Sequence, residues 1–249
     1  HSGEGALKAF GVNTVFSEEE TVEMEGEHLA ITCAVCHDPH GSDNPAQLRF
    51  PINTPSTETN LCIKCHQKRG APDPTSFRGP HSPEGPTLLG TAGWWPPGLT
   101  GPFIGTHGSE TENPELCAGC HVNSYTVTDE VTGDFVFSAT GHRFEATPCV
   151  DAQGVPIAGP CDNSEKTYAA CVDCHSEAVA ENLVDQAEAS IATDIATLRA
   201  LVEAAEISYP DDFNEDDDRY TVGEGSKFNL GLAETPGAVI HNPFLIRAL

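Results

Sequence analysis

The clearest hydrophobic period of the chain runs from residue 177 to residue 206. Apolar side chains recur there at steps of three and four residues, without an intervening Gly or Pro: Val184, Ala187, Ile191, Ile195, Leu198 and Val202. This spacing places them on one face of an α-helix, because the helix repeats every 3.6 residues. We therefore predict an amphipathic helix over 177–206, ended by Tyr209 and Pro210. A second helix is expected to begin at Asn242 and Pro243 and to lie against the first.

The first two thirds of the chain show no such period. Residues 1–27 are polar and acidic, and we interpret them as an arm or an edge strand. Over 28–177, turn-forming residues break every apolar run, and the whole chain holds 23 Gly and 19 Pro. Aliphatic residues are too few in this region to form a continuous hydrophobic core. The pattern predicts a mostly irregular and α-helical fold with three regions: the acidic arm 1–27, a central region 28–177 and a C-terminal helical region 178–249.

Four Cys-x-x-Cys-His pentapeptides lie in the central region. Their cysteine pairs are Cys33 and Cys36, Cys62 and Cys65, Cys117 and Cys120, and Cys171 and Cys174. The histidines that complete the motifs are His37, His66, His121 and His175. Two thiols at this spacing can form thioethers to one haem, and the adjoining imidazole can then ligate the iron as its proximal ligand.

Two other uses of Cys-x-x-Cys pairs fit less well. A zinc site would need two pairs to converge, and it would give no reason for a histidine after each pair. A redox dithiol would sit in a single βαβ unit, which this turn-rich sequence does not suggest. The motifs therefore predict four covalently bound c-type haems. The stacked haems would supply the missing apolar surface, with the polypeptide wrapped around them.

Further histidines are candidates for the distal face of each iron. The chain has 11 His and one Met, Met24, so bis-His ligation is the default. His40 follows His37 too closely to bind the same iron from the opposite face, so we expect it to reach a neighbouring haem. Tight glycine-containing loops carry three more candidates, and two others compete for any remaining place. The loop histidines are His81, His107 and His142; the competing pair is His28 and His241, and His1 is the weakest candidate.

These distal candidates outnumber the four irons. Either two of them are structural, or some ligation crosses a chain boundary. In the second case, polymerisation of the chain would be a coordination event.

The net charge and the two remaining cysteines indicate which partners and which cellular compartment suit the chain. The formal charge is −26 and the pI is about 4.5, which disfavours nucleic acid and anionic lipid as partners. Cys149 and Cys161 lie outside the motifs and are predicted to form a disulfide, which suits an oxidising compartment. No membrane span or leader is apparent. We expect an exported, processed chain at the cell surface or outside the cell, with the periplasm as the alternative.

Two further features leave alternatives open. The acidic run 211–218 could be a calcium loop, but Asp217 stands where an EF-hand needs Gly, and a solvated loop is favoured. The opening His1-Ser2-Gly3 could follow a Cys-x-x-Cys pair, so an upstream haem site is an alternative to a processed N-terminus.

The motifs, together with Cys-His-Asp-Pro-His-Gly at 36–41, Arg-Gly-Pro-His-Ser at 78–82 and His-Asn-Pro at 241–243, resemble the multihaem c-type cytochromes. The resemblance implies distal roles for His40 and His241. Some similar members polymerise into extracellular filaments, which implies a homopolymer. The leading function is extracytoplasmic electron transfer to redox partner proteins or extracellular acceptors, without catalysis. Two alternatives are a multihaem oxidoreductase for small nitrogen or sulfur compounds, and a structural filament stapled by haems.

Overall fold

The computed structural model of the chain describes residues 3–11, 30–73, 77–214 and 220–249. Short helices and irregular segments dominate it, as the sequence predicts. The α-helices are α1 (Gly3–Ala9), α3 (Cys33–Cys36), α4 (Glu84–Leu88), α5 (Cys117–His121), α6 (Glu177–Ser208), α7 (Val222–Ala233), α8 (Ala238–His241) and α9 (Pro243–Ala248). Two strands, β1 (Ser124–Thr128) and β2 (Phe135–Thr140), form an antiparallel hairpin.

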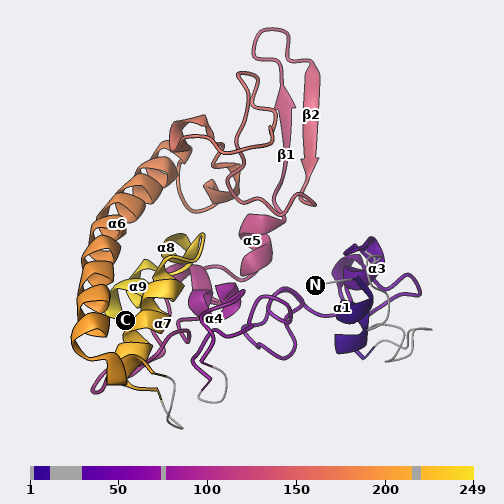
Figure 1. Cartoon of the computed structure of the whole chain (residues 1–249). Helices are drawn as coiled ribbons and strands as arrows, with labels where there is room; N and C mark the ends of the chain where they lie inside the picture. Colours follow the sequence, from indigo (N-terminus) through magenta and orange to yellow (C-terminus); the bar gives the residue numbers. More distant parts are fainter. Residues whose placement is uncertain (1–2, 12–29, 74–76, 215–219) are drawn as a thin grey trace.

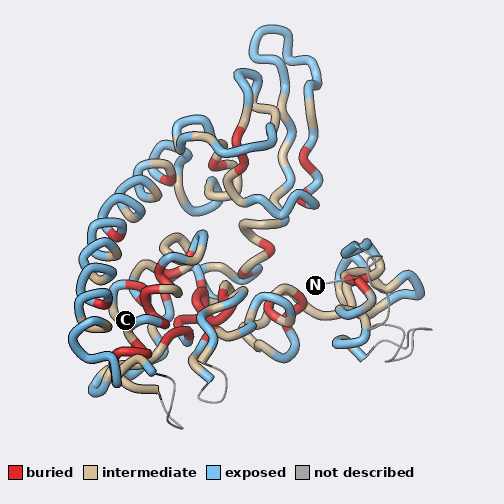
Figure 2. Tube along the Cα trace, viewed as in Figure 1, coloured by how far each residue is buried: buried red, intermediate tan, exposed pale blue. Residues whose placement is uncertain are grey.

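The elements form an open arrangement, in which α6, the hairpin and the pair α1 and α3 extend in different directions (Figure 1). Helix α6 runs along one flank, and α4, α7, α8 and α9 gather beside its C-terminal half. The hairpin projects near the N-terminal end of α6, and α1 with α3 lies on the side opposite α6. Buried residues concentrate around α4 and α7–α9, whereas the hairpin and the outer face of α6 are largely exposed (Figure 2).

The C-terminal helices form the main apolar core. Helix α6 spans 177–208, so the predicted helix is confirmed to within two residues at its end. Ile191 of α6 packs in one cluster with Leu232, Leu245 and Ile246, which confirms that the helix beginning at Pro243 lies against α6. The Asn242 side chain caps α9 by accepting a hydrogen bond from the Leu245 N–H.

Helix α7 was not predicted, because its glycines argue against a helix. Its N-terminus carries a capping box, in which Thr221 and Glu224 satisfy each other's backbone N–H groups. Gly225 is needed for packing, since a Cβ there would overlap the ring of Trp94. The core between α6 and α9 thus gains two helices beyond the predicted pair, α7 and α8.

The described part of the N-terminal region corrects one prediction. Residues 3–9 form helix α1 rather than an arm or an edge strand, because Ala6, Leu7 and Ala9 favour a helix and Phe10 anchors its end. The Phe10 ring meets Phe50 edge-on, with 5.2 Å between ring centroids. The acidic residues 12–27 of the predicted arm lie outside the described residues.

The β-hairpin is the second feature that the hydrophobic pattern did not reveal. Its strands are rich in β-branched and aromatic residues, but most of their side chains are exposed, so no buried face marks them. A register shift between Val127 and Thr128 places a bulge in β1. Beyond the hairpin, Cys149 and Cys161 form the predicted disulfide, with 6.0 Å between their Cα atoms. Within the described ranges, none of the helices has the length and hydropathy of a membrane span.

Candidate haem-binding site

Each Cys-x-x-Cys-His motif folds as a tight turn of helix or consecutive turns. The histidine N–H donates to the carbonyl of the first cysteine, at 2.8 Å in His37, 3.0 Å in His66 and 2.8 Å in His175. A helical turn places the two cysteines on the same face, because residues three apart are neighbours there. Both thiols of a motif are therefore directed towards the same side.

An intervening apolar residue anchors three of these turns. Val35, Ile63 and Ala118 are buried, with exposed fractions of 2%, 0% and 5%. Each turn is thereby pinned to the protein by a side chain opposite the thiols. The x positions of Cys-x-x-Cys-His therefore pack against the protein. The cysteines and the histidine of the motif remain available to bind haem.

Consecutive motifs lie near one another in the structure. Burial and then the nearby thiolates of Cys62 and Cys65 raise the pKa of Cys36. The hydrogen bond to the neighbouring Cys117 lowers the pKa of Cys62. These shifts belong to free thiols, since a thioether does not titrate. They identify the first motif as a neighbour of the second, and the second as a neighbour of the third.

The third motif adjoins the fourth in the same way. Burial and then the charge of Cys174 raise the pKa of Cys120. Burial and then the charge of Cys120 raise the pKa of Cys171. Each of the first three motifs therefore lies near the motif that follows it in the sequence.

Two pairs of imidazoles lie close together, with 37° between the ring planes in each pair. The ring centroids of His37 and His142 are 6.2 Å apart, and those of His121 and His241 are 6.0 Å apart. Each pair combines a motif histidine with a histidine from a remote segment. An iron held by two imidazole nitrogens at about 2 Å each requires ring centroids about 6 Å apart. The residues of both pairs therefore fit an axially ligated haem iron.

Hydrogen bonds at Nδ1 fix the orientation of five histidine rings. Four of these nitrogens meet backbone carbonyls: His37 with Ala46 at 2.7 Å, His107 with Ile240 at 3.0 Å, His121 with Phe144 at 2.9 Å and His142 with Thr140 at 3.1 Å. An Nδ1–H that donates to oxygen leaves Nε2 unprotonated and available to a metal. This is the arrangement that metal-ligating histidines use.

His66 differs from the other four in its partner. Its Nδ1 lies 3.2 Å from Oε2 of Glu84, in the first turn of α4. The hydrogen bond to Glu84 raises the pKa of His66, and the same bond lowers the pKa of Glu84. Sequence reasoning missed Glu84, because no local pattern links it to a motif 18 residues earlier.

His241 ends α8 and is mostly shielded from solvent. Burial and then the charge of His121 lower its pKa to about 4. The ring is therefore neutral at pH 7, which is the form that binds a metal. Asn242 fixes this segment, since its Nδ2 donates to the carbonyls of Thr87 and Phe103 at 3.2 and 2.7 Å.

A small hollow lies beside His121 at the base of the hairpin. Tyr125, Gly141 and Arg143 help to line it. The Tyr125 hydroxyl is buried and has no hydrogen-bond partner among the described residues. A hydroxyl and a guanidinium beside a motif histidine are suitable partners for a haem carboxylate.

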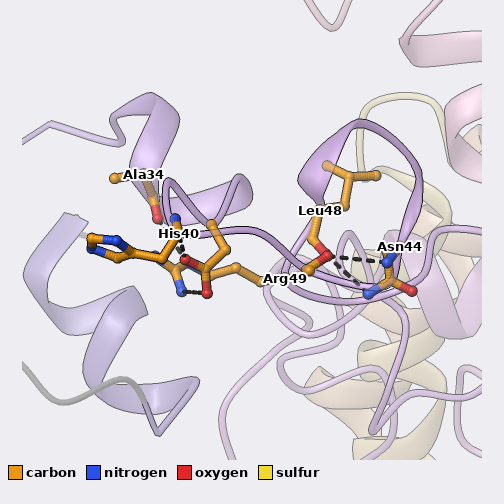
Figure 3. Close-up of polar contacts among 7 residues, drawn as sticks. Ala34, His40, Asn44, Leu48 and Arg49 are labelled. Atoms are coloured by element: carbon orange, nitrogen blue, oxygen red, sulfur yellow. Dashed lines mark hydrogen bonds and ion pairs between the residues drawn. The ribbon is translucent and has the colours of Figure 1, made fainter.

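The remaining predicted ligands are not paired with another imidazole in the described parts of the chain. His40 is exposed, and its N–H donates to Oδ1 of Asp38 at 3.0 Å. Arg49 holds Asp38 through a 3.0 Å ion pair, and the His40 ring points away from this contact (Figure 3). His81 lies in an exposed loop, and His175 is half-buried. His1 and His28 lie outside the described residues, so all these ligand assignments stay predictions.

The acidic run that the sequence offered as a calcium loop is only partly described, because residues 215–219 lie outside the described ranges. Asp212 accepts a hydrogen bond from the Gly223 N–H at 2.7 Å and so supports the start of α7. Across the described residues, no three His, Cys, Asp or Glu side chains converge as a protein-only metal site requires.

Comparisons with known proteins agree with the motifs and the fold. The family described as doubled CXXCH motif matches residues 27–71, which contain the first two motifs. The doubled motif and the similar fold support a multihaem c-type cytochrome, and the paired Cys-x-x-Cys-His motifs indicate covalently bound c-type haem.

One solved structure, the crystal structure of the outer cell wall cytochrome OcwA, has a similar fold, with a TM-score of 0.54 and 20% sequence identity. The match covers 97% of this chain and 45% of OcwA, so the chain spans less than half the length of that cytochrome. No curated protein sequence matches the chain.

Proposed function

We propose that this chain binds four c-type haems in sequence order and passes single electrons along them outside the cytoplasm. The observation that carries the proposal is the pair of facing imidazoles at both His37–His142 and His121–His241. Haem supplies the one-electron chemistry when it is bound. The polypeptide supplies the ligands, the spacing and the hydrogen bonds that set each potential.

The distances between imidazole rings support a choice of axial ligands for two of the haems. His37 and His142 would ligate the first iron, and His121 and His241 the third. His66 and His175 would be the proximal ligands of the second and fourth. Their distal ligands would come from His28, His40, His81 and His107, or from a neighbouring copy of the chain.

The proximity of consecutive motifs supports a continuous path for electrons. Each haem would be tethered through two thioethers to its motif, and each motif adjoins the next. Haems tethered to adjacent motifs are held close together. An electron would therefore have a neighbouring acceptor at each step.

Location and assembly are part of the same proposal. The Cys149–Cys161 disulfide supports an oxidising compartment, and the structural neighbour OcwA is an outer cell wall cytochrome. The surplus of candidate histidines over irons supports a homopolymer in which one chain ligates a haem of the next. In that case, dissociation of the polymer would convert one ferric haem per chain from low spin to high spin. A spin state independent of assembly would remove inter-subunit ligation from the proposal.

Haem content and spin state test the central claim on the intact protein. The mass should exceed that of the 26.4 kDa polypeptide by four haems, and all ferric haems should be low-spin. The reduced native assembly should not bind carbon monoxide. A high-spin haem that persists in the assembled protein and binds carbon monoxide would instead favour an oxidoreductase acting on small nitrogen or sulfur compounds.

A further inference from the structure

The hydrogen-bond partner of His66 sets it apart among the motif histidines. His37 and His121 place Nδ1 against neutral backbone carbonyls, whereas His66 places Nδ1 against the Glu84 carboxylate. At neutral pH an ordinary glutamate is ionised, since its usual pKa is about 4.3. The second motif is thus the one, among the three whose Nδ1 contacts are described, that combines its imidazole with a negative charge.

A carboxylate that accepts a hydrogen bond from a ligating imidazole changes the metal bound to that imidazole. It draws the N–H proton towards itself and makes the ring a stronger electron donor. Stronger donation stabilises the ferric state relative to the ferrous state. The reduction potential of such a haem is therefore lower than that of a haem whose histidine donates to a neutral carbonyl.

Local packing holds Glu84 at this position. Glu84 begins α4, and the following residue, Gly85, donates its N–H to the His66 carbonyl at 2.8 Å. A Cβ at Gly85 would come within 2.7 Å of Ile63 and 2.8 Å of the His66 carbonyl oxygen. Helix α4 therefore packs directly on the second motif, and only glycine permits the approach.

The same helix also contacts the segment that carries His241. The Thr87 carbonyl accepts a hydrogen bond from Asn242 at 3.2 Å, and Asn242 follows His241. Helix α4 thus connects the second motif to the remote histidine that faces the third. The backbone of α4 is held from both sides, which keeps the Glu84 side chain within reach of His66.

We propose that Glu84 is a positioning residue that lowers the reduction potential of the haem bound at the second motif. It acts through His66 and does not touch the iron. This inference rests on the proposed function, because it requires haem at Cys62 and Cys65 with His66 as a ligand. It adds that the second haem is a low-potential step inside the path rather than one of four equivalent centres.

Potentiometric titration of the full-length haem-loaded protein tests the inference. Glu84→Gln keeps the size of the side chain and an oxygen that accepts the hydrogen bond, but it removes the charge. One of the four haems should shift to a more positive potential, and the other three should shift less. Paramagnetic NMR, which identifies a haem through its axial histidines, should assign the shifted centre to His66.

Two further variants separate local tuning from other effects. Glu58→Gln removes the same charge from an exposed glutamate four residues before Cys62, and its shifts should be small at all four haems. Glu84→Asp keeps the charge but shortens the side chain, so the second haem should shift in the same direction by a smaller amount. If Glu84→Gln does not fold, the potential of the second haem in Glu84→Asp alone tests the inference.

Equal shifts in Glu84→Gln and Glu58→Gln, or a shift shared evenly by all haems, would overturn the inference. A wild-type protein without four low-spin haems would instead overturn the proposed function. The potentials of the variants therefore test the inference about Glu84, and the haem content of the wild type tests the proposed function.

Discussion

Histidine rings acquire their roles here from their neighbours rather than from their own chemistry. His142 illustrates this, since its Nδ1 meets the Thr140 carbonyl and its ring faces His37. His40 has the same side chain and lies next to a motif, but its ring meets no other imidazole among the described residues. In the His37–His142 pair, a backbone carbonyl orients each ring at Nδ1 and the ring centroids lie 6.2 Å apart, which suits two axial ligands of one iron.

Removal of His142 should therefore open one iron. In His142→Ala we expect one of the four ferric haems to become high-spin, because the distal face of the first haem loses its nitrogen. Electron paramagnetic resonance should show the high-spin signal, and the reduced protein should bind one equivalent of carbon monoxide. The control Val131→Ala changes an exposed residue at the turn of the β1–β2 hairpin and should leave all haems low-spin. An unchanged spin state in His142→Ala would contradict the His37–His142 pair.

Helices divide between those that carry the core and those that carry the motifs. Helix α6 is long because an uninterrupted apolar stripe packs against α7, α8 and α9. Helices α3 and α5 are single turns whose positions are set by one buried residue each, Val35 and Ala118. The C-terminal helices thus form a conventional core, and the motif turns depend on contacts with their surroundings.

The buried face of α6 should dominate the stability of the C-terminal region. Ile191 is 2% exposed and lies in the core cluster, so Ile191→Ala should lower the free energy of unfolding by about 2–5 kcal/mol. Leu201 lies on the same helix but is 63% exposed, so Leu201→Ala should change it by less than about 0.5 kcal/mol. Guanidinium denaturation followed by helical circular dichroism measures both. Equal losses would show that α6 does not pack as described.

Charge acts at the scale of the whole molecule. A formal charge of −26 creates a negative potential that extends beyond individual contacts. This potential favours encounters with cationic redox partners and disfavours encounters with anionic ones. Because the haems would be wrapped by an acidic polypeptide, partner selection begins before any specific contact is made.

Ionic strength should therefore affect oppositely charged probes in opposite ways. The rate of electron exchange with a cationic ruthenium hexaammine complex should fall as salt is raised, because screening shortens the reach of the attraction to about 8 Å at 0.15 M. The rate with anionic ferricyanide should rise over the same range. Stopped-flow absorbance of the haem bands measures both. The same salt dependence for the two probes would show that net charge does not steer encounter.

Local patterns predicted what depends on neighbours in sequence. The thiols and the histidine of each motif act within five residues, so Cys62, Cys65 and His66 could be identified without a structure. The period of α6 and the cap at Asn242 are equally local, and the structure confirms both. The glycine-rich helix α7 and the exposed hairpin escaped prediction, because packing against Trp94 and cross-strand pairing outweigh weak local signals.

The sequence by itself determined the four motifs and their order along the chain, and from them it predicts the kind of cofactor and its attachment points. Only the tertiary structure decided that His142 faces His37, that His241 faces His121 and that Glu84 accepts a hydrogen bond from His66. The physical reason is the range of the interactions. Covalent attachment requires residues joined by a few peptide bonds, whereas an axial pair requires two remote segments to meet about 6 Å apart. Loop paths set that distance, and no periodicity in the sequence encodes it.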